Sequence, residues 1–595
     1  IPRLGIPGIR FADGPRGVVV GRSTAFPVSM ARGASFDVAL EERIGEAIGR
    51  EARAQGANLF AGVCINLLRH PAWGRAQETY GEDSHLLGEM GAALVRGTQR
   101  HVMACIKHYA CNSMENSRFW VDVKIDEADL RDLYLPHFEK CVDEGAASVM
   151  SAYNKVNGEW CGGHHHLLTE GLKDDWDFDG LVISDFTFGV RGSALACFEA
   201  GLDVEMPFGW RFKKLGRALR GGRLDRARLI DAAGRLLHQQ DRQAERGEPE
   251  RYVAEAVASP EHRALAREAA VAGTVLLQND GLLPLDPSRI TSVAVIGRLA
   301  TIANTGDLGS SRVRAPEVVT LLDGLRAAGE RHGVTVEHDD GSDPEAAAAL
   351  AERCDVVVLA VGNTFRDEGE WIGKDGGDRK RLTLRPVDEA LVQRVARANA
   401  RTAVVLYGGS VFVTEAWRTQ VGAMVMAWYA GMEGGAAVAD VLFGDEVPGG
   451  RLPCSWPVSA ADLPPFKRFT RKIVYGPLHG YRKFEADGTH PAFAFGHGLG
   501  YTTVEWGGPE VAGGEVRVAL TNTGDRPGVE VVQIYRSEAL GTEPRDLRTL
   551  RGFTKVRLAP GETVTATVPL PDDGKAGTLW LGPSSEPAHL VALDE

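Results

Sequence analysis

The first 237 residues alternate short apolar runs with stretches that have the spacing of amphipathic helices. This alternation predicts a parallel sheet covered by helices, because parallel strands are joined by long crossover connections that are usually helical. The length of the block fits a (β/α)8-type barrel. The predicted strands are residues 61–67, 101–106, 147–152, 181–184 and 202–206, and two of the predicted helices are 40–55 and 127–144.

Two further blocks follow the first one. A polar, arginine-rich stretch reads as a linker, and the alternating strand and helix pattern after it predicts an open α/β sandwich. Period-two segments separated by turn residues then predict a small β-sandwich. We therefore predict a barrel over 1–237, a linker over 238–262, an α/β sandwich over 263–465, a connecting segment over 466–505 and a β-sandwich over 506–595.

Charge and cysteine usage restrict the classes of function. The formal net charge of −13 argues against a general nucleic-acid binder, which needs an excess of Lys and Arg. The eight cysteines lie among apolar neighbours with no C-x-x-C pair, which predicts buried free thiols and favours a cytoplasmic location. No apolar run of about 18 residues appears, which argues against a membrane-spanning helix, and the first residues do not form a signal peptide. The chain opens directly on motif-like sequence, however, so an N-terminal segment that precedes it remains an alternative.

An apolar run over 182–184 ends in Asp185. Catalytic groups of barrel enzymes lie where strands end, so we predict that Asp185 faces a substrate pocket; the alternative is a helix cap. Polar groups also stand where other predicted strands give way to loops. They are Asp13, Arg75, Lys107, His108, Tyr153, Asn154, Asp203 and Glu205. Several fixed donors and acceptors around one ring are what sugar recognition requires.

These motifs, in this order, resemble the N-terminal barrel of glycoside hydrolase family 3, and 182–186 (VISDF) resembles the nucleophile motif of that family. The resemblance continues through 264–285 and 444–453, which are similar to the start and end of the family's α/β sandwich. The segment 495–502 (FGHGLGYT) resembles the approach to its fibronectin type III-like domain. The resemblance implies a retaining β-glycosidase of three domains without a carbohydrate-binding insert.

The resemblance also assigns roles to individual residues. Asp185 would attack the anomeric carbon, Tyr153 would lie beside it, and Glu78 would support Arg75. The residues that would hold the hydroxyls of the sugar are Asp13, Arg75, Lys107 and His108. On the aglycone side, Phe186 stands where many relatives have Trp, and Trp371 is a second candidate.

The second carboxyl group would come from the second domain, from the loop 363–371 that follows the predicted strand 355–362. Glu368 is the first choice, because Glu-Gly resembles the family's acid/base dipeptide. Glu370 is its rival, since the Asp-Arg pair that usually follows closely is displaced to 378–379 by an apparent insertion, and Asp375 is a more distant one. A charged loop is otherwise just solvated surface.

Asp13 favours a hexose, so we expect hydrolysis of terminal β-D-glucosyl residues from a small glycoside or oligosaccharide. The alternatives are a β-xylosidase or another exo-β-glycosidase of the family, and a non-catalytic carbohydrate-binding relative, since fold alone does not establish activity. Gly309-Ser310-Ser311 lacks the glycine pattern of a dinucleotide site, and no metal-ligand spacing stands out. We expect no cofactor, no metal, no nucleic acid and no membrane partner, and we consider a homodimer as the assembly.

Overall fold

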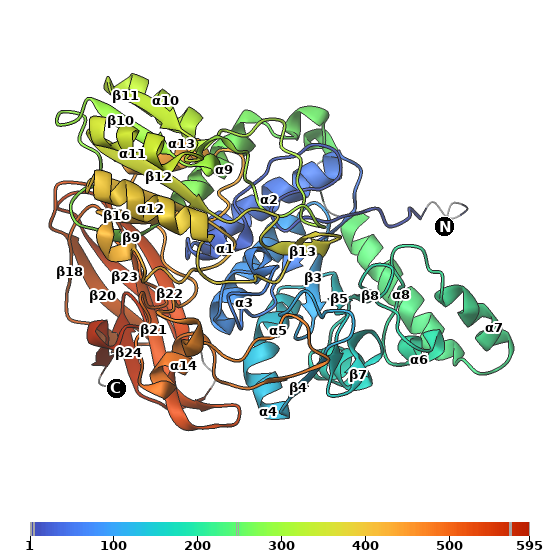
Figure 1. Cartoon of the computed structure of the whole chain (residues 1–595). Coiled ribbons are helices and arrows are strands. Elements are labelled where there is room, and N and C mark those ends of the chain that lie inside the picture. Colours follow the sequence, from blue (N-terminus) through green and yellow to red (C-terminus); the bar gives the residue numbers. More distant parts are fainter. Residues whose placement is uncertain (1–2, 4–5, 245–246, 248, 571–573, 594–595) are drawn as a thin grey trace.

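The computed structural model describes residues 1–595 apart from 1–2, 4–5, 245–246, 248, 571–573 and 594–595. Three bodies are visible in Figure 1: the N-terminal barrel region in blue and cyan, an α/β body in yellow-green, and a β-sandwich in orange and red. Helices from the end of the first body project away from the other two. The predicted fold class, a barrel-type body followed by an α/β sandwich and a β-sandwich, is confirmed.

The first body is built on a curled parallel half-barrel. Its strand order is β1-β2-β3-β5-β8, and an isolated parallel bridge joins Ile183 to Val204 at its edge. Every residue of β2, β3, β5 and β8 is buried, which explains their continuous apolar runs. The strands are β1 (Phe11–Ala12), β2 (Leu59–Cys64), β3 (Met103–Tyr109), β5 (Ser148–Ser151) and β8 (Leu181–Ser184).

The eightfold repeat is incomplete. The predicted strand 202–206 is reduced to the bridge at Val204, and the described residues after it form helices: α7 (Leu215–Arg220) and α8 (Arg226–Ala244). The predicted helix over 127–144 is also interrupted. A short α4 (Glu127–Asp129) and a π-helical turn precede α5 (Pro136–Asp143), because Pro136 has no N–H to continue a helix and instead begins one.

The second body is a six-stranded sheet of order β11-β10-β12-β15-β16-β9, in which only β9 runs antiparallel to its neighbour. Apolar clusters cover both faces of this sheet. The strands are β9 (Val275–Asn279), β10 (Ser292–Ile296), β11 (Thr335–Asp339), β12 (Val356–Gly362), β15 (Thr402–Tyr407) and β16 (Ala423–Met426). The helices are α9 (Pro260–Gly273), α10 (Leu321–His332), α11 (Pro344–Arg353), α12 (Pro386–Ala398) and α13 (Gly434–Phe443).

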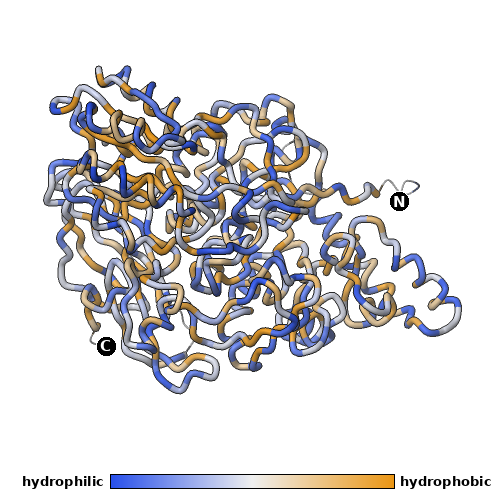
Figure 2. Tube along the Cα trace, viewed as in Figure 1, coloured by the Kyte–Doolittle hydropathy of each residue, from blue (hydrophilic) through white to orange (hydrophobic). Residues whose placement is uncertain are grey.

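Part of the predicted linker 238–262 is helical. Helix α8 continues to Ala244 because Gln239 and Gln243 are buried on its inner side, and α9 already begins at Pro260. In Figure 2 the orange, apolar segments concentrate inside the sheets, whereas the projecting helices carry more blue. The eight cysteines are buried free thiols, as predicted. Among the helices of the described residues, none combines the length and the apolar composition needed to cross a bilayer.

The third body packs two sheets, one of order β18-β20-β19 with β23 paired to β20, the other of order β22-β21-β24-β25. Its long hairpin consists of β21 (Gly528–Leu540) and β22 (Glu543–Leu558). The tip of this hairpin reaches the barrel, where Thr542 N donates to Asp129 Oδ1 over 2.7 Å. The remaining strands are β18 (Val504–Trp506), β19 (Glu510–Ala512), β20 (Glu515–Asn522), β23 (Thr563–Pro569), β24 (Leu579–Gly582) and β25 (Val591–Leu593).

Asp83 ties parts of the chain that lie far apart in sequence. Its Oδ1 caps helix α3 (Ser84–Thr98) by accepting from His85 N at 2.8 Å, and its Oδ2 accepts from Tyr481 OH at 2.7 Å. Arg482 Nη1 lies 3.4 Å from the same Oδ2. Tyr481 OH in turn accepts from Leu550 N in β22. One buried carboxylate therefore joins the barrel to the connecting segment and the β-sandwich.

We expect Asp83→Ala to lower the free energy of unfolding by about 3–5 kcal/mol, because it leaves the buried Arg482 guanidinium without its carboxylate. The matched control is Asp126→Ala, which removes an exposed N-cap from Ala128 N and should cost about 1 kcal/mol. Urea denaturation followed by circular dichroism measures both. Equal losses for the two variants would contradict the role of Asp83 as a junction.

Candidate active site

Polar side chains gather at the carboxyl edge of the half-barrel. Asp13 directly follows β1, Lys107 and His108 lie near the end of β3, and Tyr153 and Asp185 follow β5 and β8. The carboxyl ends of parallel strands meet at one edge of a sheet, so these five side chains converge although up to 172 residues separate them. All five are buried, with exposures of 1–7%.

Asp185 keeps one oxygen free. Phe186 N donates to its Oδ1 at 2.7 Å, whereas Oδ2 is buried without a hydrogen-bond partner among the described residues. His108 Nε2 lies 3.8 Å from that Oδ2. Burial raises the pKa of Asp185 to about 6, although Arg75, Arg118 and Lys107 oppose the shift. The carboxylate is therefore ionised near neutral pH with an uncommitted oxygen, which suits a nucleophile.

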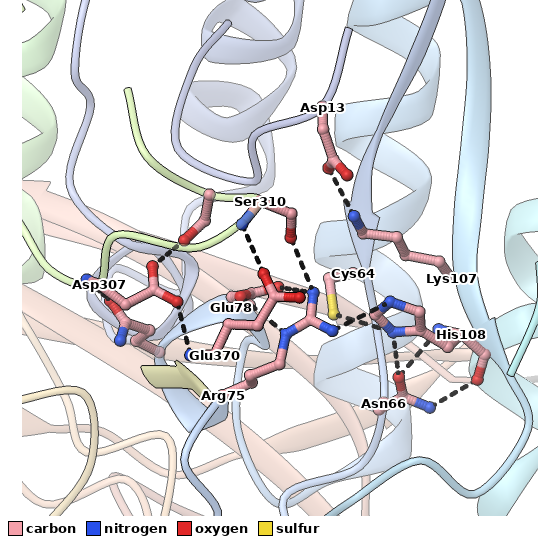
Figure 3. A network of polar contacts seen from close by, with 12 residues as sticks. Asp13, Cys64, Asn66, Arg75, Glu78, Lys107, His108, Asp307, Ser310 and Glu370 are labelled. Atoms are coloured by element: carbon pink, nitrogen blue, oxygen red, sulfur yellow. Dashed lines mark hydrogen bonds and ion pairs between the residues drawn. The ribbon is translucent and has the colours of Figure 1, made fainter. Parts of the chain in front are cut away.

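Arg75 lies at the centre of the site (Figure 3). Its Nε and Nη2 donate to both oxygens of Glu78 at 2.9 and 2.7 Å, so Glu78 supports it as a bidentate partner. Its Nη1 is 3.3 Å from His108 Nε2, and its Nη2 donates to Ser310 Oγ at 3.3 Å. Arg75 thus bridges the barrel to a loop of the second domain.

His108 is held as a neutral imidazole. Burial, followed by the nearby Arg75 and Lys107, keeps the pKa of His108 well below its ordinary value. Its Nδ1 faces Asn66 Oδ1 at 3.1 Å, so Nδ1 carries the proton and Nε2 accepts from Arg75. The neutral ring fixes Arg75 without adding a second positive charge.

Asp13 and Lys107 form a buried ion pair of 2.5 Å, and Gly14 N donates to Asp13 Oδ1 at 2.8 Å. A buried pair of this kind offers charged acceptors and donors to a polar ligand at one side of the pocket. Tyr153 OH donates to Phe186 O at 2.6 Å, which places the ring beside the residue that follows Asp185.

The two candidate glutamates of the second domain differ in what surrounds them. Glu368 is fully buried inside that domain: Arg379 Nε donates to its Oε2, and Gly409 N at 2.7 Å and Tyr429 OH donate to its Oε1. Both of its oxygens are committed. Glu370 instead points toward Arg75 and Ser310 in Figure 3, with its side chain 15% exposed.

The charges of the barrel act directly on Glu370. Ser310 N donates to its Oε2, and Arg118 Nη2 lies 3.1 Å from its Oε1. Burial works to raise the pKa of Glu370, but Arg75 and Arg118 outweigh it and lower the pKa to about 2. In the unliganded site Glu370 is therefore ionised.

The apparent insertion 370–377 is a hairpin. Strands β13 (Gly369–Ile372) and β14 (Asp375–Gly377) pair antiparallel, and Glu370 lies on the first of them. Asp378, which follows β14, accepts from the backbone N–H groups of Gly74, Glu115 and Asn116 at 2.9 Å each. These bonds fix the hairpin over the barrel. Asp375, the third candidate, is exposed on β14.

Three residues of the site were not assigned from the sequence. Arg118 contacts Glu370 and Glu115, and Ser310 contacts Arg75 and Glu370. Burial raises the pKa of Glu115 to about 8 despite Arg118, and its Oε1 accepts from Trp371 N. Arg118 and Glu115 lie within eleven residues of Lys107 in the sequence, and this nearness is the signal that could have found them. Ser310 carries no such signal, since it is brought in by a loop of the other domain.

Some residues at strand ends serve the scaffold. Asp203 is bound by Lys173 Nζ at 2.8 Å and Arg228 Nη2 at 2.7 Å, and Glu205 accepts from the backbone N–H groups of Arg211 and Phe212. Asn154 donates to the backbone oxygen of Ala110. Of the two residues expected on the aglycone side, Phe186 packs edge-on against Phe11, and Trp371 packs edge-on against Phe469. Asp203, Glu205 and Asn154 thus hold the frame of the pocket.

Known proteins resemble the chain over nearly its whole length. Residues 2–239 match the Glycosyl hydrolase family 3 N terminal domain, 274–501 the Glycosyl hydrolase family 3 C-terminal domain, and 530–576 a Fibronectin type III-like domain. Thermostable beta-glucosidase B of Acetivibrio thermocellus is 34% identical, with 96% of this chain and 79% of that protein covered. An exo-alpha-(1->6)-L-arabinopyranosidase of Bifidobacterium breve is 31% identical over 97% of this chain and 80% of its own.

A solved structure agrees with the matched domains and with the similar sequences. The crystal structure of a Bifidobacterium adolescentis GH3 beta-glucosidase superposes with a TM-score of 0.90 at 28% identity, covering 100% of this chain and 91% of the other. The matched domains, the curated relatives and the superposition extend over the half-barrel, the α/β body and the β-sandwich alike. The chain therefore belongs to glycoside hydrolase family 3 and is a glycoside hydrolase.

Proposed function

We propose that the protein is an exo-acting, retaining β-glucosidase that removes terminal non-reducing β-D-glucosyl residues through a covalent glycosyl-enzyme. One continuous series of contacts supports the proposal. It leads from Asp185 to His108 (3.8 Å), from His108 to Arg75 (3.3 Å), from Arg75 to Ser310 (3.3 Å), and from Ser310 N to Glu370. Two carboxylates from different domains thus border the same buried, cation-lined site.

Asp185 supplies the nucleophile. Its free Oδ2 attacks the anomeric carbon, the glycosidic bond to the leaving oxygen breaks, and a glycosyl ester of Asp185 forms with inverted configuration. Attack by water then restores the original configuration and releases the sugar. Retention requires the two carboxyl groups to stand roughly 5–5.5 Å apart across the sugar.

Glu370, in place of Glu368, is the acid/base in this proposal. Both oxygens of Glu368 are occupied by Arg379, Gly409 and Tyr429, and removing it from them would leave a buried guanidinium without a partner. Glu370 borders the pocket and its partners are groups that a sugar can replace. It protonates the leaving oxygen in the first step and takes a proton from water in the second.

The low pKa of Glu370 keeps the group ionised in the unliganded site, which is the form that the second step needs. The first step needs a proton on the same group. Sugar hydroxyls that bind Arg75 and Arg118 withdraw these cations from Glu370, and closure of the site by substrate removes water, so both changes favour the protonated form. Substrate binding and protonation of the acid are therefore coupled.

The sugar end of the site fits a hexose. Asp13 and Lys107 form a buried pair that offers an acceptor and donors to hydroxyls at the side of the pocket away from the leaving group. Several relatives carry the name beta-glucosidase, which supports glucose as the sugar. The arabinopyranosidase among the relatives makes a pentopyranoside the competing substrate.

Substitutions separate the two glutamates. Asp185→Asn should reduce kcat on 4-nitrophenyl β-D-glucoside by at least about 10⁴-fold, because the amide cannot form the ester. Glu370→Gln should lose about 10²–10⁴-fold on a glucoside with a poor leaving group, but much less on an activated one. Azide, which needs no general base, should restore turnover of Glu370→Gln and give β-glucosyl azide.

Glu368→Gln is the matched control for this experiment. It should be less stable, because it weakens the buried pair with Arg379, and its remaining activity should not respond to azide. If azide accelerates Glu368→Gln and not Glu370→Gln, the assignment of Glu370 is wrong. Detection of a glucosyl adduct on Asp185 by mass spectrometry after trapping with a 2-fluoroglucoside tests the nucleophile separately.

The pH profile should report Asp185. The nucleophile acts only when ionised. On an activated glucoside, the kcat/KM of Glu370→Gln, in which the acid/base no longer titrates, should therefore fall as the pH drops through about 6, and the arginine variants are compared in that background. Arg118→Met removes a cation that stabilises this carboxylate, which raises its pKa and moves the acidic limb to higher pH. Arg191→Met, which removes an arginine stacked over Phe119 and Phe188, should leave the limb where it is. A limb that moves equally in both variants would contradict the assignment.

A panel of 4-nitrophenyl glycosides tests the sugar. We expect kcat/KM to be highest for β-D-glucoside and at least about tenfold lower for β-D-xyloside and α-L-arabinopyranoside, which lack the hydroxymethyl arm and its contacts. Asp13→Asn should lower the value for the glucoside more than for the xyloside. A preference for either pentoside would replace glucose as the substrate without changing the chemistry.

A further inference from the structure

A second cavity, of about 410 Å³, lies beside the β13–β14 hairpin. Its volume is in the range of small-molecule sites. Seven of its fourteen lining residues are Arg or Lys, and only two are acidic. The chain as a whole has a net charge of −13, so this cavity differs in sign from the protein around it.

The acidic residues of this cavity are already occupied. Asp367 forms a bidentate pair with Arg385, and Asp378 accepts its three backbone N–H bonds. Of the cations, Arg379 is bound to Glu368. Five cations remain that form no ion pair with any described residue: Arg366, Lys374, Lys380, Arg381 and Arg468.

Arg468 is the least exposed of these five. Its Nε is buried and has no hydrogen-bond partner among the described residues. A buried donor without an acceptor is unfavourable unless a ligand supplies one. Beside it the wall is aromatic, formed by Phe469 and Trp371, whose ring centroids are 5.8 Å apart. The cavity therefore combines cationic donors with an aromatic wall.

The cavity is separate from the sugar site but shares a strand with it. Glu370 and Trp371 are consecutive in β13, at an irregularity in its pairing with β14, and their side chains have different surroundings. Glu370 contacts Arg118 and Ser310, whereas Trp371 lines the cavity. None of the residues that we assign to the sugar or to catalysis lines it.

We propose that this cavity binds a small oxyanion with at least two negative charges, carrying phosphate or carboxylate groups, and that its occupation alters catalysis through the hairpin that carries Glu370. Arg and Lys donate charge-assisted hydrogen bonds to such groups, and Arg matches their planar geometry. Trp371 and Phe469 offer apolar ring surface to the organic part of the ligand. The shared chemistry has two sources: a free anionic metabolite, or an acidic aglycone of the glucoside itself.

Binding is tested first with inorganic pyrophosphate as the probe, by isothermal titration calorimetry at low ionic strength on Asp185→Asn, so that no turnover is needed. We expect one site per chain, weakened by added salt since the cations are largely exposed. Arg468→Met and Lys380→Met should each weaken binding by about tenfold or more, the loss of one charge-assisted contact.

Lys467→Met is the matched control, because Lys467 is the exposed neighbour of Arg468 in the chain and does not line the cavity. It should change the dissociation constant by less than about twofold. Absence of binding, or an equal loss in Lys467→Met and Arg468→Met, would overturn the site.

The kinetic arm rests on the proposed function, and it separates the two sources. Pyrophosphate that changes kcat for 4-nitrophenyl β-D-glucoside without competing with it indicates a free effector. An acidic aglycone is indicated if a 4-carboxyphenyl or 4-phosphophenyl glucoside has a higher kcat/KM than 4-nitrophenyl β-D-glucoside, and if this difference is lost both in Arg468→Met and on addition of pyrophosphate. If pyrophosphate binds yet alters the turnover of neither substrate, the coupling through the hairpin is wrong. If no glycoside is hydrolysed at all, the calorimetry still decides on the site.

Discussion

The carboxylate of Asp378 holds the second domain against the barrel at the active site. It is buried, it belongs to the second domain, and it accepts backbone N–H groups of Gly74, Glu115 and Asn116 from the barrel. A second bond, from Arg379 N to Ala72 O at 2.8 Å, supports the same junction. Because backbone groups make these contacts, they depend on the path of the chain, and they hold the end of the hairpin against the barrel.

The electrostatics of the site follow from this junction. Docking the second domain brings Glu370 next to Arg75 and Arg118, two cations that also stabilise the ionised form of Asp185. Without Glu370, Arg75 and Arg118 would each lose one neighbouring carboxylate. Without the barrel, Glu370 would lose the two cations that lower its pKa. The pKa of Glu370 is therefore a property of the assembled domains, whereas the pKa of Asp185 is set by burial and by cations of the barrel itself.

The sequence was sufficient for features that depend on local pattern. Asp185 lies where the apolar run 182–184 places it, at the end of β8, and the predicted strand 181–184 has the observed bounds. Edge strands were missed where their composition is mixed, as in Thr335–Asp339 of β11. Local pattern also could not show that Val204 makes only a bridge, because strand length there depends on closure of the sheet.

The choice between Glu368 and Glu370 illustrates what sequence could not decide. The two glutamates are two residues apart on the same loop, yet one closes a buried network with Arg379 and Tyr429 while the other faces the barrel. The difference arises from the hairpin, whose insertion separates Glu370 from the Asp-Arg pair at 378–379.

The same hairpin gives the molecule a second surface close to its chemistry. Glu370 on β13 contacts Arg118 and Ser310, whereas its neighbour Trp371 lines the cavity. The residues that follow β14 supply the cations Lys380 and Arg381. The insertion that carries Glu370 therefore also supplies part of the wall of that cavity.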